Sequence, residues 1–124
     1  LAYFDVSIEY HQTYKINKNI HSLIHEIYKE FKNKPYNNYI NSNGYSLGIV
    51  QWNSHDIDLV NLSLKFPNVL FSLQYKSEIQ LDQSWKKYYF NGKSQHLYPE
   101  VNIQSELGSI YTIWPKCNLV ENNL

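Results

Sequence analysis

Residues 62–95, LSLKFPNVLFSLQYKSEIQLDQSWKKYYFNGKSQ, contain the pattern that decides the fold class of this chain. They begin with the end of a helix, which Pro67 stops because proline lacks a backbone N–H group. The alternation of apolar and polar residues over 68–76 then indicates a half-buried strand. Asn91-Gly92 is a strong signal for a two-residue turn, so the strands on its two sides are expected to form a β-hairpin.

The preceding residues predict further strands and a longer helix. Residues 3–10 alternate between apolar and polar, which is typical of a strand with one buried face. An apolar stripe at helical spacing runs through residues 17–34, and Pro35 ends that helix. Residues 45–52 are expected to form another strand with the odd-numbered residues on one face, and a short strand also fits residues 36–40.

A second helix is expected to begin after Asn53 or Ser54, either of which can cap it, and to end at Pro67. The order of elements is then β-α-β-β-α-β followed by a β-hairpin. An α+β fold of the ferredoxin-like type satisfies this order, with an antiparallel sheet, two helices on one face and a C-terminal β-hairpin extension. The 124 residues suit one domain, expected over 1–104, with residues 105–124 as a C-terminal extension packed on the body or partly frayed.

Composition argues against several classes of protein. The formal net charge is zero, all eleven basic residues are lysines, and arginine is absent. Nucleic-acid binding is therefore not expected, because basic residues supply most of the affinity for phosphates, and arginine reads guanine. No apolar run approaches the roughly 18–20 residues of a membrane span, and the first residues lack a signal-peptide pattern, so a cytoplasmic location is expected. The single cysteine, Cys117, excludes an internal disulfide framework.

Several short motifs occur together in the second third of the chain. They are the strand-like GIVQW at 48–52, the helix end LSLKFP at 62–67, the strand VLFSL at 69–73, and Trp85 and Tyr89 ahead of Asn91-Gly92-Lys93. Through them, residues 45–95 resemble the YubB-type ferredoxin-like domain of plasmids and phages and similar small proteins of mobile elements. The chain departs from that pattern at 96–103, HLYPEVNI, and in its C-terminal tail. The resemblance implies the fold and a mobile-element origin, and it carries no catalytic residues across.

Two histidines form a candidate metal site. His21 and His25 are four residues apart on the first predicted helix, a spacing that places both imidazoles on one face. No third ligand is identifiable, and HSLIHE does not have the HExxH order, so two surface histidines beside an apolar stripe are the alternative. The sequence therefore implies no cofactor, and these two residues are the candidates for a metal.

Two groups of residues are candidates for contact with a partner. Trp52, His55 and Asp56 lie at the predicted junction between a strand and the second helix, where an exposed aromatic ring favours an interface, and acid–base chemistry by the histidine is an alternative. The hairpin adds Lys86, Tyr88, His96 and Tyr98. Aromatic rings among lysines can stack bases, but cross-strand pairing that stabilises the hairpin accounts for most of these rings.

No Gly-rich phosphate loop, nucleophile elbow or spaced carboxylate set is present. We therefore expect a small non-enzymatic binding protein of mobile-element type that blocks or sequesters a partner protein, in an inhibitor, immunity or anti-defence role. The same contact surface would also suit a homodimer. Binding of a nucleotide or single-stranded RNA through an aromatic sheet surface is the alternative, and a metal-dependent or histidine-based hydrolase is a third hypothesis.

Overall fold

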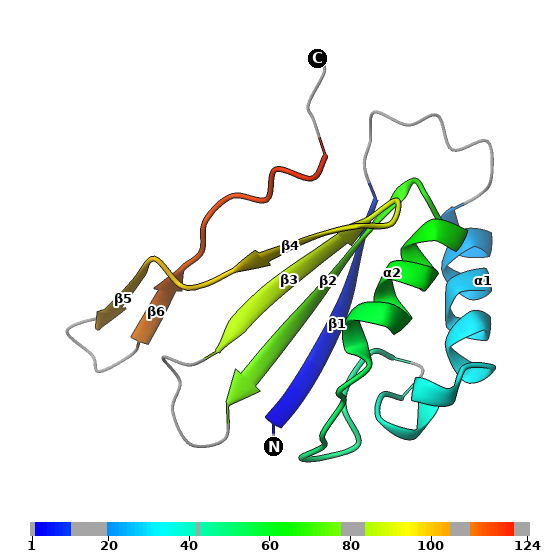
Figure 1. Cartoon of the computed structure of the whole chain (residues 1–124), viewed down its shortest axis with the longest axis horizontal. Helices are drawn as coiled ribbons and strands as arrows, with labels where there is room; N and C mark the ends of the chain where they lie inside the picture. The colour runs from blue at the N-terminus through cyan, green and yellow to red at the C-terminus, as the bar shows by residue number, and fades with distance from the viewer. Residues whose placement is uncertain (1, 11–19, 42, 78–83, 105–109, 121–124) are drawn as a thin grey trace.

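The computed structural model describes residues 2–10, 20–41, 43–77, 84–104 and 110–120, and it has the expected α+β class (Figure 1). Its elements are β1 (Ala2–Tyr10), α1 (Ile20–Lys32), the 3₁₀-helix η1 (Pro35–Asn38), α2 (His55–Lys65), β2 (Val69–Ser77), β3 (Trp85–Phe90), β4 (Lys93–Leu97), β5 (Val101–Gln104) and β6 (Ile110–Ile113). Among these described elements, no helix is long and apolar enough to cross a membrane.

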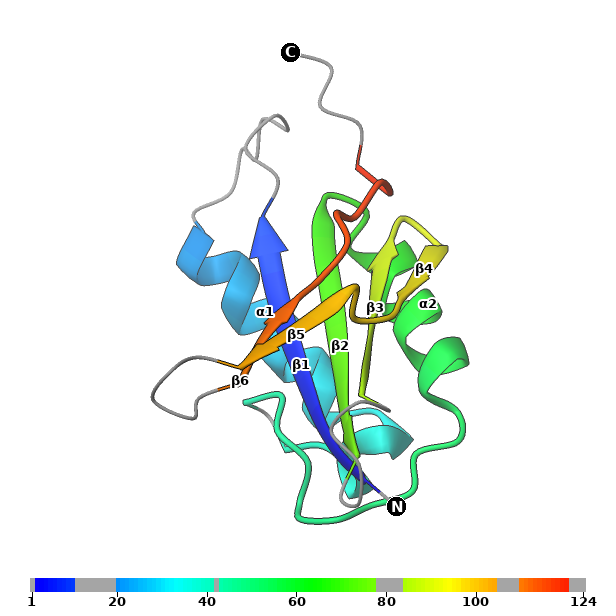
Figure 2. The same ribbon diagram turned by 90° about the vertical axis from the view of Figure 1, so that its left-hand side faces the viewer.

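Four strands form one antiparallel sheet in the order β1-β2-β3-β4. β1 and β2 pair along their whole length, from Ala2 opposite Ser77 to Tyr10 opposite Val69, although residues 11–68 separate them in the chain. Both α1 and α2 cover one face of this sheet, and β5 pairs with β6 on the other side (Figure 1, Figure 2). The antiparallel sheet and the placement of both helices on one face are as predicted.

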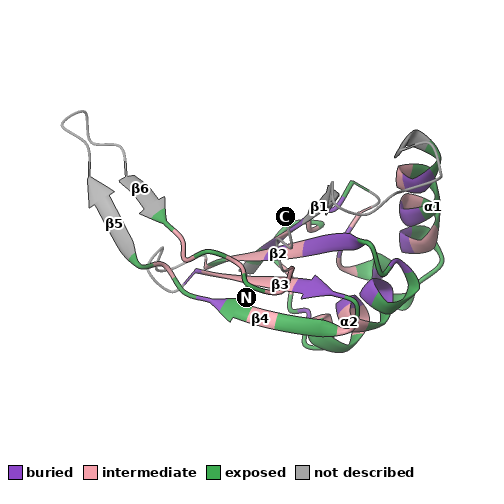
Figure 3. Cartoon of the chain, turned by 90° about the horizontal axis from the view of Figure 1, so that it is seen from above, coloured by how far each residue is buried: buried purple, intermediate pink, exposed green. Residues whose placement is uncertain are grey.

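The core lies between the sheet and the two helices (Figure 3). Successive side chains of a strand point to opposite faces, so alternate residues of β1, β2 and β3 reach it. The sheet contributes Phe4, Val6, Val69, Phe71, Leu73 and Tyr89. The helices and the segments beside them contribute Leu23, Ile27, Phe31, Tyr36, Ile40, Trp52, Leu59, Leu62 and Phe66. Burial of this apolar surface is the main force that stabilises the fold.

The elements predicted from residues 62–95 are confirmed. α2 ends at Lys65, just before Pro67, and β2 begins at Val69. β3 and β4 form the expected antiparallel pair on the two sides of Asn91-Gly92. The helix stop, the alternating strand and the hairpin therefore follow directly from local sequence.

The turn between β3 and β4 is fixed to α2. Asn91 has a φ of 47° and Gly92 a φ of 81°, both left-handed values, as a type I′ turn requires. The Gly92 N–H donates a hydrogen bond to Ser63 Oγ of α2 at 2.9 Å. Leu64 lies so close that a Cβ on residue 92 would come within 2.7 Å of its Cδ2. The backbone conformation therefore favours glycine here, and the Leu64 side chain would have to move to admit a Cβ.

The strand predicted over residues 45–52 does not form, and the ferredoxin-like order is not found among the described elements. That segment makes isolated bridges, such as Asp5 with Tyr45 and Ile40 with Ser46. The described order is β-α-α-β-β-β-β-β, counting the two α-helices, and the four-stranded sheet is sequential instead of interleaved. The short strand predicted over 36–40 is also wrong, because this stretch begins with the turn of η1.

Two glycines with positive φ explain why this segment does not continue as a strand. Gly44 has a φ of 91° and Gly48 a φ of 105°, values that turn the chain away from extended backbone. The side chains of Tyr45, Leu47 and Ile49 are 57%, 59% and 39% exposed. The alternating pattern is present, but its apolar face is turned to solvent.

The C-terminal segment contacts the face of the sheet opposite the helices. The Lys86 ammonium lies 4.9 Å from the centre of the Trp114 ring, and the Asn118 N–H donates to Gln95 Oε1 at 2.7 Å. Trp114 and Asn118 of the tail thus contact β3 and β4, while the expectation that the tail is packed on the body or partly frayed stays a prediction. The domain boundary predicted at residue 104 stays a prediction, and the pairing of β5 with β6 extends across it.

Candidate functional site

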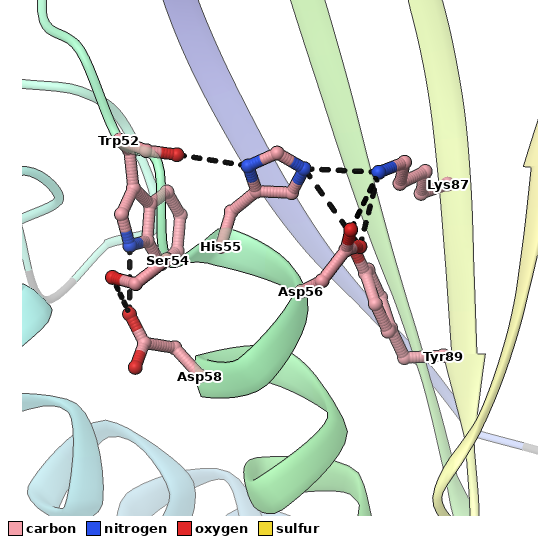
Figure 4. Close-up of polar contacts among 7 residues, drawn as sticks. All are labelled: Trp52, Ser54, His55, Asp56, Asp58, Lys87 and Tyr89. Atoms are coloured by element: carbon pink, nitrogen blue, oxygen red, sulfur yellow. Dashed lines mark hydrogen bonds and ion pairs between the residues drawn. The ribbon is translucent and has the colours of Figure 1, made fainter.

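A group of polar side chains connects the start of α2 with the middle of β3 (Figure 4). We call it the α2–β3 cluster, and its members are Trp52, Ser54, His55, Asp56, Asp58, Lys87 and Tyr89. Strand alternation turns Lys87 and Tyr89 toward the helices, and Tyr89 is fully buried. The first turn of α2 then supplies the groups that these two side chains meet.

Lys87 is the centre of the α2–β3 cluster. Its Nζ lies 3.0 Å from Oδ1 and 2.9 Å from Oδ2 of Asp56, and 3.0 Å from Nε2 of His55. The same ammonium lies 5.0 Å from the centre of the Trp85 ring, within the range of a cation–π contact. Only 13% of the Lys87 side chain is exposed. The charge is thus paired and hydrogen-bonded, as burial of a charge requires.

Tyr89 and Lys87 together hold Asp56 as a carboxylate. The Tyr89 hydroxyl donates to Asp56 Oδ1 at 2.7 Å. Burial raises the pKa of Asp56, but the hydrogen bonds from Tyr89 and Lys87 outweigh burial and bring this pKa below its usual value. Burial and the neighbouring carboxylate raise the pKa of Tyr89, so its hydroxyl keeps its proton and remains a donor.

The partners of His55 assign it as a neutral imidazole. Its Nδ1 lies 2.8 Å from the carbonyl oxygen of Trp52, which can only accept, so Nδ1 carries the hydrogen. Its Nε2 is then an acceptor and receives a hydrogen bond from the Lys87 ammonium. Both ring nitrogens are engaged within the protein. This geometry does not present His55 as a free general base, which would need a nitrogen within reach of a substrate proton.

Trp52 is a core residue and not the surface contact that the sequence predicts. It is 2% exposed, because its ring packs against those of Phe4, Tyr36 and Tyr39. Its Nε1 donates to Asp58 Oδ2 at 2.8 Å, and Ser54 Oγ donates to the same oxygen at 2.8 Å. Ser54 occupies the predicted N-cap position, but its side chain caps no backbone N–H group of the helix. These bonds anchor the loop to the first turn of α2.

A row of aromatic rings crosses the sheet beside the α2–β3 cluster. The strand register places Phe4 opposite Tyr75 and Tyr75 opposite Trp85, and the row continues through His96 to Tyr98. The distances between successive ring centres are 5.6, 4.8, 5.0 and 4.5 Å. Exposure rises from 5% at Phe4 to 62% at Tyr98. We call these five residues the aromatic row.

Most of the aromatic row offers no free face for a nucleic-acid base. Tyr75 stacks on one face of Trp85 at an interplanar angle of 7°. The Lys87 ammonium and the His55 ring lie against the Trp85 ring, 5.0 and 5.4 Å from its centre. Base stacking needs an uncovered ring face. The cross-strand packing role, which the sequence also indicated, therefore describes Trp85 better than base binding.

Strand alternation divides the hairpin residues that were predicted to share a contact surface. His96 lies opposite Lys87 in the register, so it shares the helix-facing side of the sheet, and Tyr98 follows it on the same side. Lys86 and Tyr88 alternate with Lys87 and point to the opposite face. His96 and Tyr98 are exposed, whereas Lys86 meets the C-terminal tail. The predicted residues therefore lie on two faces.

The predicted histidine pair is described only in part. His25 is exposed on α1, while the side chain of His21 lies outside the described residues. Within the described parts of the chain, no three His, Cys, Asp or Glu side chains gather as a metal site requires.

No family model, curated protein or solved structure matches this chain. The resemblance of residues 45–95 to YubB-type domains therefore stays a prediction. The candidate site accordingly rests on the contacts and exposures of the described residues.

Sequence reasoning missed Lys87 and Tyr89, although a signal for both is present. Alternation along β3 places them on the same face as Trp85, and that face was expected to pack. A lysine on the core-facing side of a strand needs an acidic partner nearby. Asp56 supplies that partner from the first turn of α2, the helix that packs against β3.

Four exposed apolar side chains belong to β1 and to residues 45–49, the segment that Tyr45 bridges to β1, and none of them was predicted to contact a partner. We call them the edge patch: Tyr3, Tyr45, Leu47 and Ile49, which are 45%, 57%, 59% and 39% exposed. Tyr45 is bridged to Asp5, so its side chain shares a face with Asp5 and with Tyr3 two residues earlier. Contiguous exposed apolar surface marks interaction sites in folded proteins.

As the pH falls, protonation of His96 is expected to lower the free energy of unfolding at a higher pH than protonation of Asp56. Burial, followed by the charge of Lys87, lowers the pKa of His96 in the folded state. A histidine with a lowered folded pKa contributes stability that is complete above its unfolded pKa of about 6.5 and declines as the pH falls below it. Asp56, whose folded pKa is also lowered, loses its contribution at lower pH, as the pH falls through that folded value.

Urea unfolding at pH values of about 7.5 and 5.5 measures the histidine part. The free energy of unfolding should be lower at the lower pH, and His96→Asn should make this difference smaller. His25→Asn, a change at an exposed histidine on α1, is the control and should leave it unchanged. An unaltered pH dependence in His96→Asn contradicts the assignment to His96.

Proposed function

We propose that this chain is a small non-enzymatic protein that binds a partner protein through the edge patch and thereby blocks or sequesters it. The observation that carries the proposal is the exposure of Tyr3 on β1 together with Tyr45, Leu47 and Ile49 in the segment bridged to it. Two of these four side chains are tyrosines, which supply large contact area at low cost in conformational entropy. Aromatic residues are also enriched at the centres of interfaces.

The backbone of the edge patch is held in place before any partner arrives. The Val6 N–H donates to the Gly44 carbonyl at 2.8 Å, and the Ser46 N–H donates to the Phe4 carbonyl at 3.0 Å. The Phe4 N–H in turn donates to Ser46 Oγ at 3.1 Å. A surface that is already ordered loses less conformational freedom on binding, which favours affinity.

The α2–β3 cluster supports the non-enzymatic part of the proposal. Its charged and polar groups bind one another: Lys87 binds Asp56 and His55, and Tyr89 binds Asp56. A catalytic group needs a free atom directed at a substrate. The cluster is better suited to holding the start of α2 against β3, as a support for the fold.

The mobile-element origin, and with it an inhibitor, immunity or anti-defence role, rests on the resemblance of residues 45–95 and is part of the proposal. Self-association through the edge patch is the main competing use of the same surface. Binding of a nucleotide or single-stranded RNA is the alternative function. The zero net charge and the covered faces of Trp85 weigh against it.

The double variant Tyr45→Ser/Leu47→Ser tests the proposal. It should abolish capture of a partner from a lysate of the source cells, with at least a tenfold loss of affinity for the purified partner, because hot-spot residues cost about 2 kcal/mol or more each. Its free energy of unfolding should change by less than about 1 kcal/mol, since both side chains are exposed. Co-purification measures the capture, calorimetry with the purified partner measures the affinity, and urea unfolding measures the stability.

The matched control is Ile57→Ser, which removes an apolar side chain that is 68% exposed on α2, away from the edge patch. It should retain the partner. The proposal is contradicted if Ile57→Ser loses the partner as fully as the double variant does. It is also contradicted if the wild-type chain captures no stable partner at micromolar concentration. A dimer of the wild-type chain that the double variant dissolves would assign the patch to self-association. RNA binding that weakens steeply with salt would favour the alternative.

A further inference from the structure

A pocket of about 220 Å³ opens between α1, η1 and α2, on the helical side of the molecule and separate from the edge patch. The side chains that matter in its lining are Glu30, Lys34, Tyr36, Asp58, Asn61 and Lys65. Asp58, Asn61 and Lys65 are spaced three and four residues apart, so they lie along one face of α2. The pocket therefore runs beside that face of the helix.

One end of the pocket carries a net positive charge. Glu30 binds Lys65 at 2.6 Å and Lys34 at 3.0 Å. Hydrogen bonds from Lys65 and then Lys34 lower the pKa of Glu30, so it is ionised and the three groups sum to one positive charge. Both lysine side chains are about half exposed, at 56% and 43%, and each ammonium keeps donors beyond those used by Glu30.

The other end of the pocket carries a negative charge. Asp58 stands seven residues before Lys65 on α2, which places their Cα atoms roughly 10 Å apart. Both hydrogen bonds described at Asp58, from Trp52 and Ser54, fall on Oδ2. Among the described contacts, Asp58 Oδ1 accepts no hydrogen bond, so it can accept one from a ligand. The pocket has one charge of each sign at its two ends.

Tyr36 supplies a second and independent indication of a ligand. It is 3% exposed and lines the pocket, yet its hydroxyl has no hydrogen-bond partner among the described residues. Burial, and then the charges of Asp58 and Glu30, raise the pKa of Tyr36, so the hydroxyl keeps its proton. Buried polar groups without a partner are rare, because each carries an uncompensated desolvation cost. The charges of Asp58 and Glu30, one at each end of the pocket, both act on this hydroxyl.

We propose that this pocket binds a small zwitterion, a molecule of amino-acid size with an ammonium and a carboxylate on one short carbon chain. The ammonium binds Asp58 Oδ1, the carboxylate accepts from the donors of Lys34 and Lys65 that Glu30 leaves free, and the Tyr36 hydroxyl donates to the carboxylate. The exposed lysine side chains at the rim move to admit it. The proposal does not depend on the edge patch or on a protein partner.

Calorimetric titration with a series of ω-amino acids tests the assignment. Glycine, β-alanine, γ-aminobutyrate and ε-aminocaproate separate the two charges by increasing lengths, while butylamine and butyrate carry one charge each. At least one zwitterion should bind fivefold or more tightly than both single-charge compounds. Equal binding of butylamine or butyrate overturns the zwitterion assignment, and no binding of any compound at millimolar concentration overturns the site.

Tyr36→Phe separates a ligand-binding hydroxyl from a structural one. Without ligand, its thermal midpoint should equal or exceed that of the wild type, because a hydroxyl without a partner has been removed. Its affinity for the best zwitterion should fall about tenfold or more, as expected for one lost hydrogen bond to a charged group. Lys34→Gln should weaken binding as well and leave the pair of Glu30 with Lys65 intact.

The matched control is Tyr98→Phe, a change at a tyrosine that is 62% exposed at the end of the aromatic row. It should bind the zwitterion as the wild type does. Unchanged affinity in Tyr36→Phe, or an equal loss in Tyr98→Phe, overturns the role of the Tyr36 hydroxyl. A less stable Tyr36→Phe protein also counts against it, since it would mean that the hydroxyl already has a partner.

Discussion

Replacing Trp52 with alanine is expected to reduce the free energy of unfolding by about 3–5 kcal/mol, the usual cost of deleting a buried tryptophan side chain. The indole is 2% exposed and contacts the rings of Phe4, Tyr36 and Tyr39. Its removal leaves a cavity and takes away the hydrogen bond to Asp58. Urea denaturation followed by far-UV circular dichroism measures the loss.

Two further variants show which property of Trp52 matters. Trp52→Phe keeps an aromatic ring but loses the N–H donor, so its stability should lie between those of the wild type and Trp52→Ala. Trp114→Ala removes a half-buried tryptophan on the tail, and it should cost less than about 1.5 kcal/mol. A Trp52→Ala protein of normal stability that no longer binds its partner would restore the surface role predicted from the sequence.

Gly44→Ala is expected to destabilise the protein by about 3–5 kcal/mol, from backbone strain together with a steric clash. The φ of Gly44 is +91°, where residues with a side chain are strained. A Cβ at this position would also lie 2.4 Å from the carbonyl oxygen of Val6, a backbone atom that cannot turn aside. The clash would push residue 44 away from β1, where its carbonyl accepts the Val6 N–H at 2.8 Å.

Gly48→Ala is the matched control for this prediction. Its φ of +105° imposes similar backbone strain, but nothing lies within 4 Å of the added Cβ. The expected cost is therefore strain alone, about 1–2 kcal/mol. The difference between the two variants, measured by urea unfolding, isolates the contact with β1. Equal losses in the two proteins would contradict the close approach of Gly44 to β1.

Local sequence patterns predicted the elements correctly where the apolar face of the pattern is buried in the structure. The alternation in β2 and the Asn91-Gly92 turn each match the structure, because one face of the strand is buried and the turn needs positive φ. Residues 45–52 show the same alternation, but its apolar side chains are exposed. Alternation indicates that one face differs from the other, and it does not indicate whether a partner strand or a covering layer is present.

The candidate site was harder to predict because it joins residues that are far apart in the chain. His55 and Asp56 were recognised as a pair at a helix start, but their partner Lys87 comes from β3. Trp52 was taken as an exposed ring, whereas the fold closes over it. The sequence alone does not determine which loop segment lies above a given side chain. The Tyr36 hydroxyl without a partner is likewise visible only once burial is known.

The sequential order of the sheet determines when the chain is most at risk of aggregation. Among the described strands of that sheet, β2, β3 and β4 pair with near neighbours, but β1 joins β2 only after residues 11–68 have been enclosed. Closing so long a loop is slow compared with forming a hairpin. Until β1 arrives, β2 presents an open edge with the uncharged segment VLFSLQY, which contains no proline. Contacts that hold β1, including the one at Gly44, therefore also limit the time during which two chains can pair through β2.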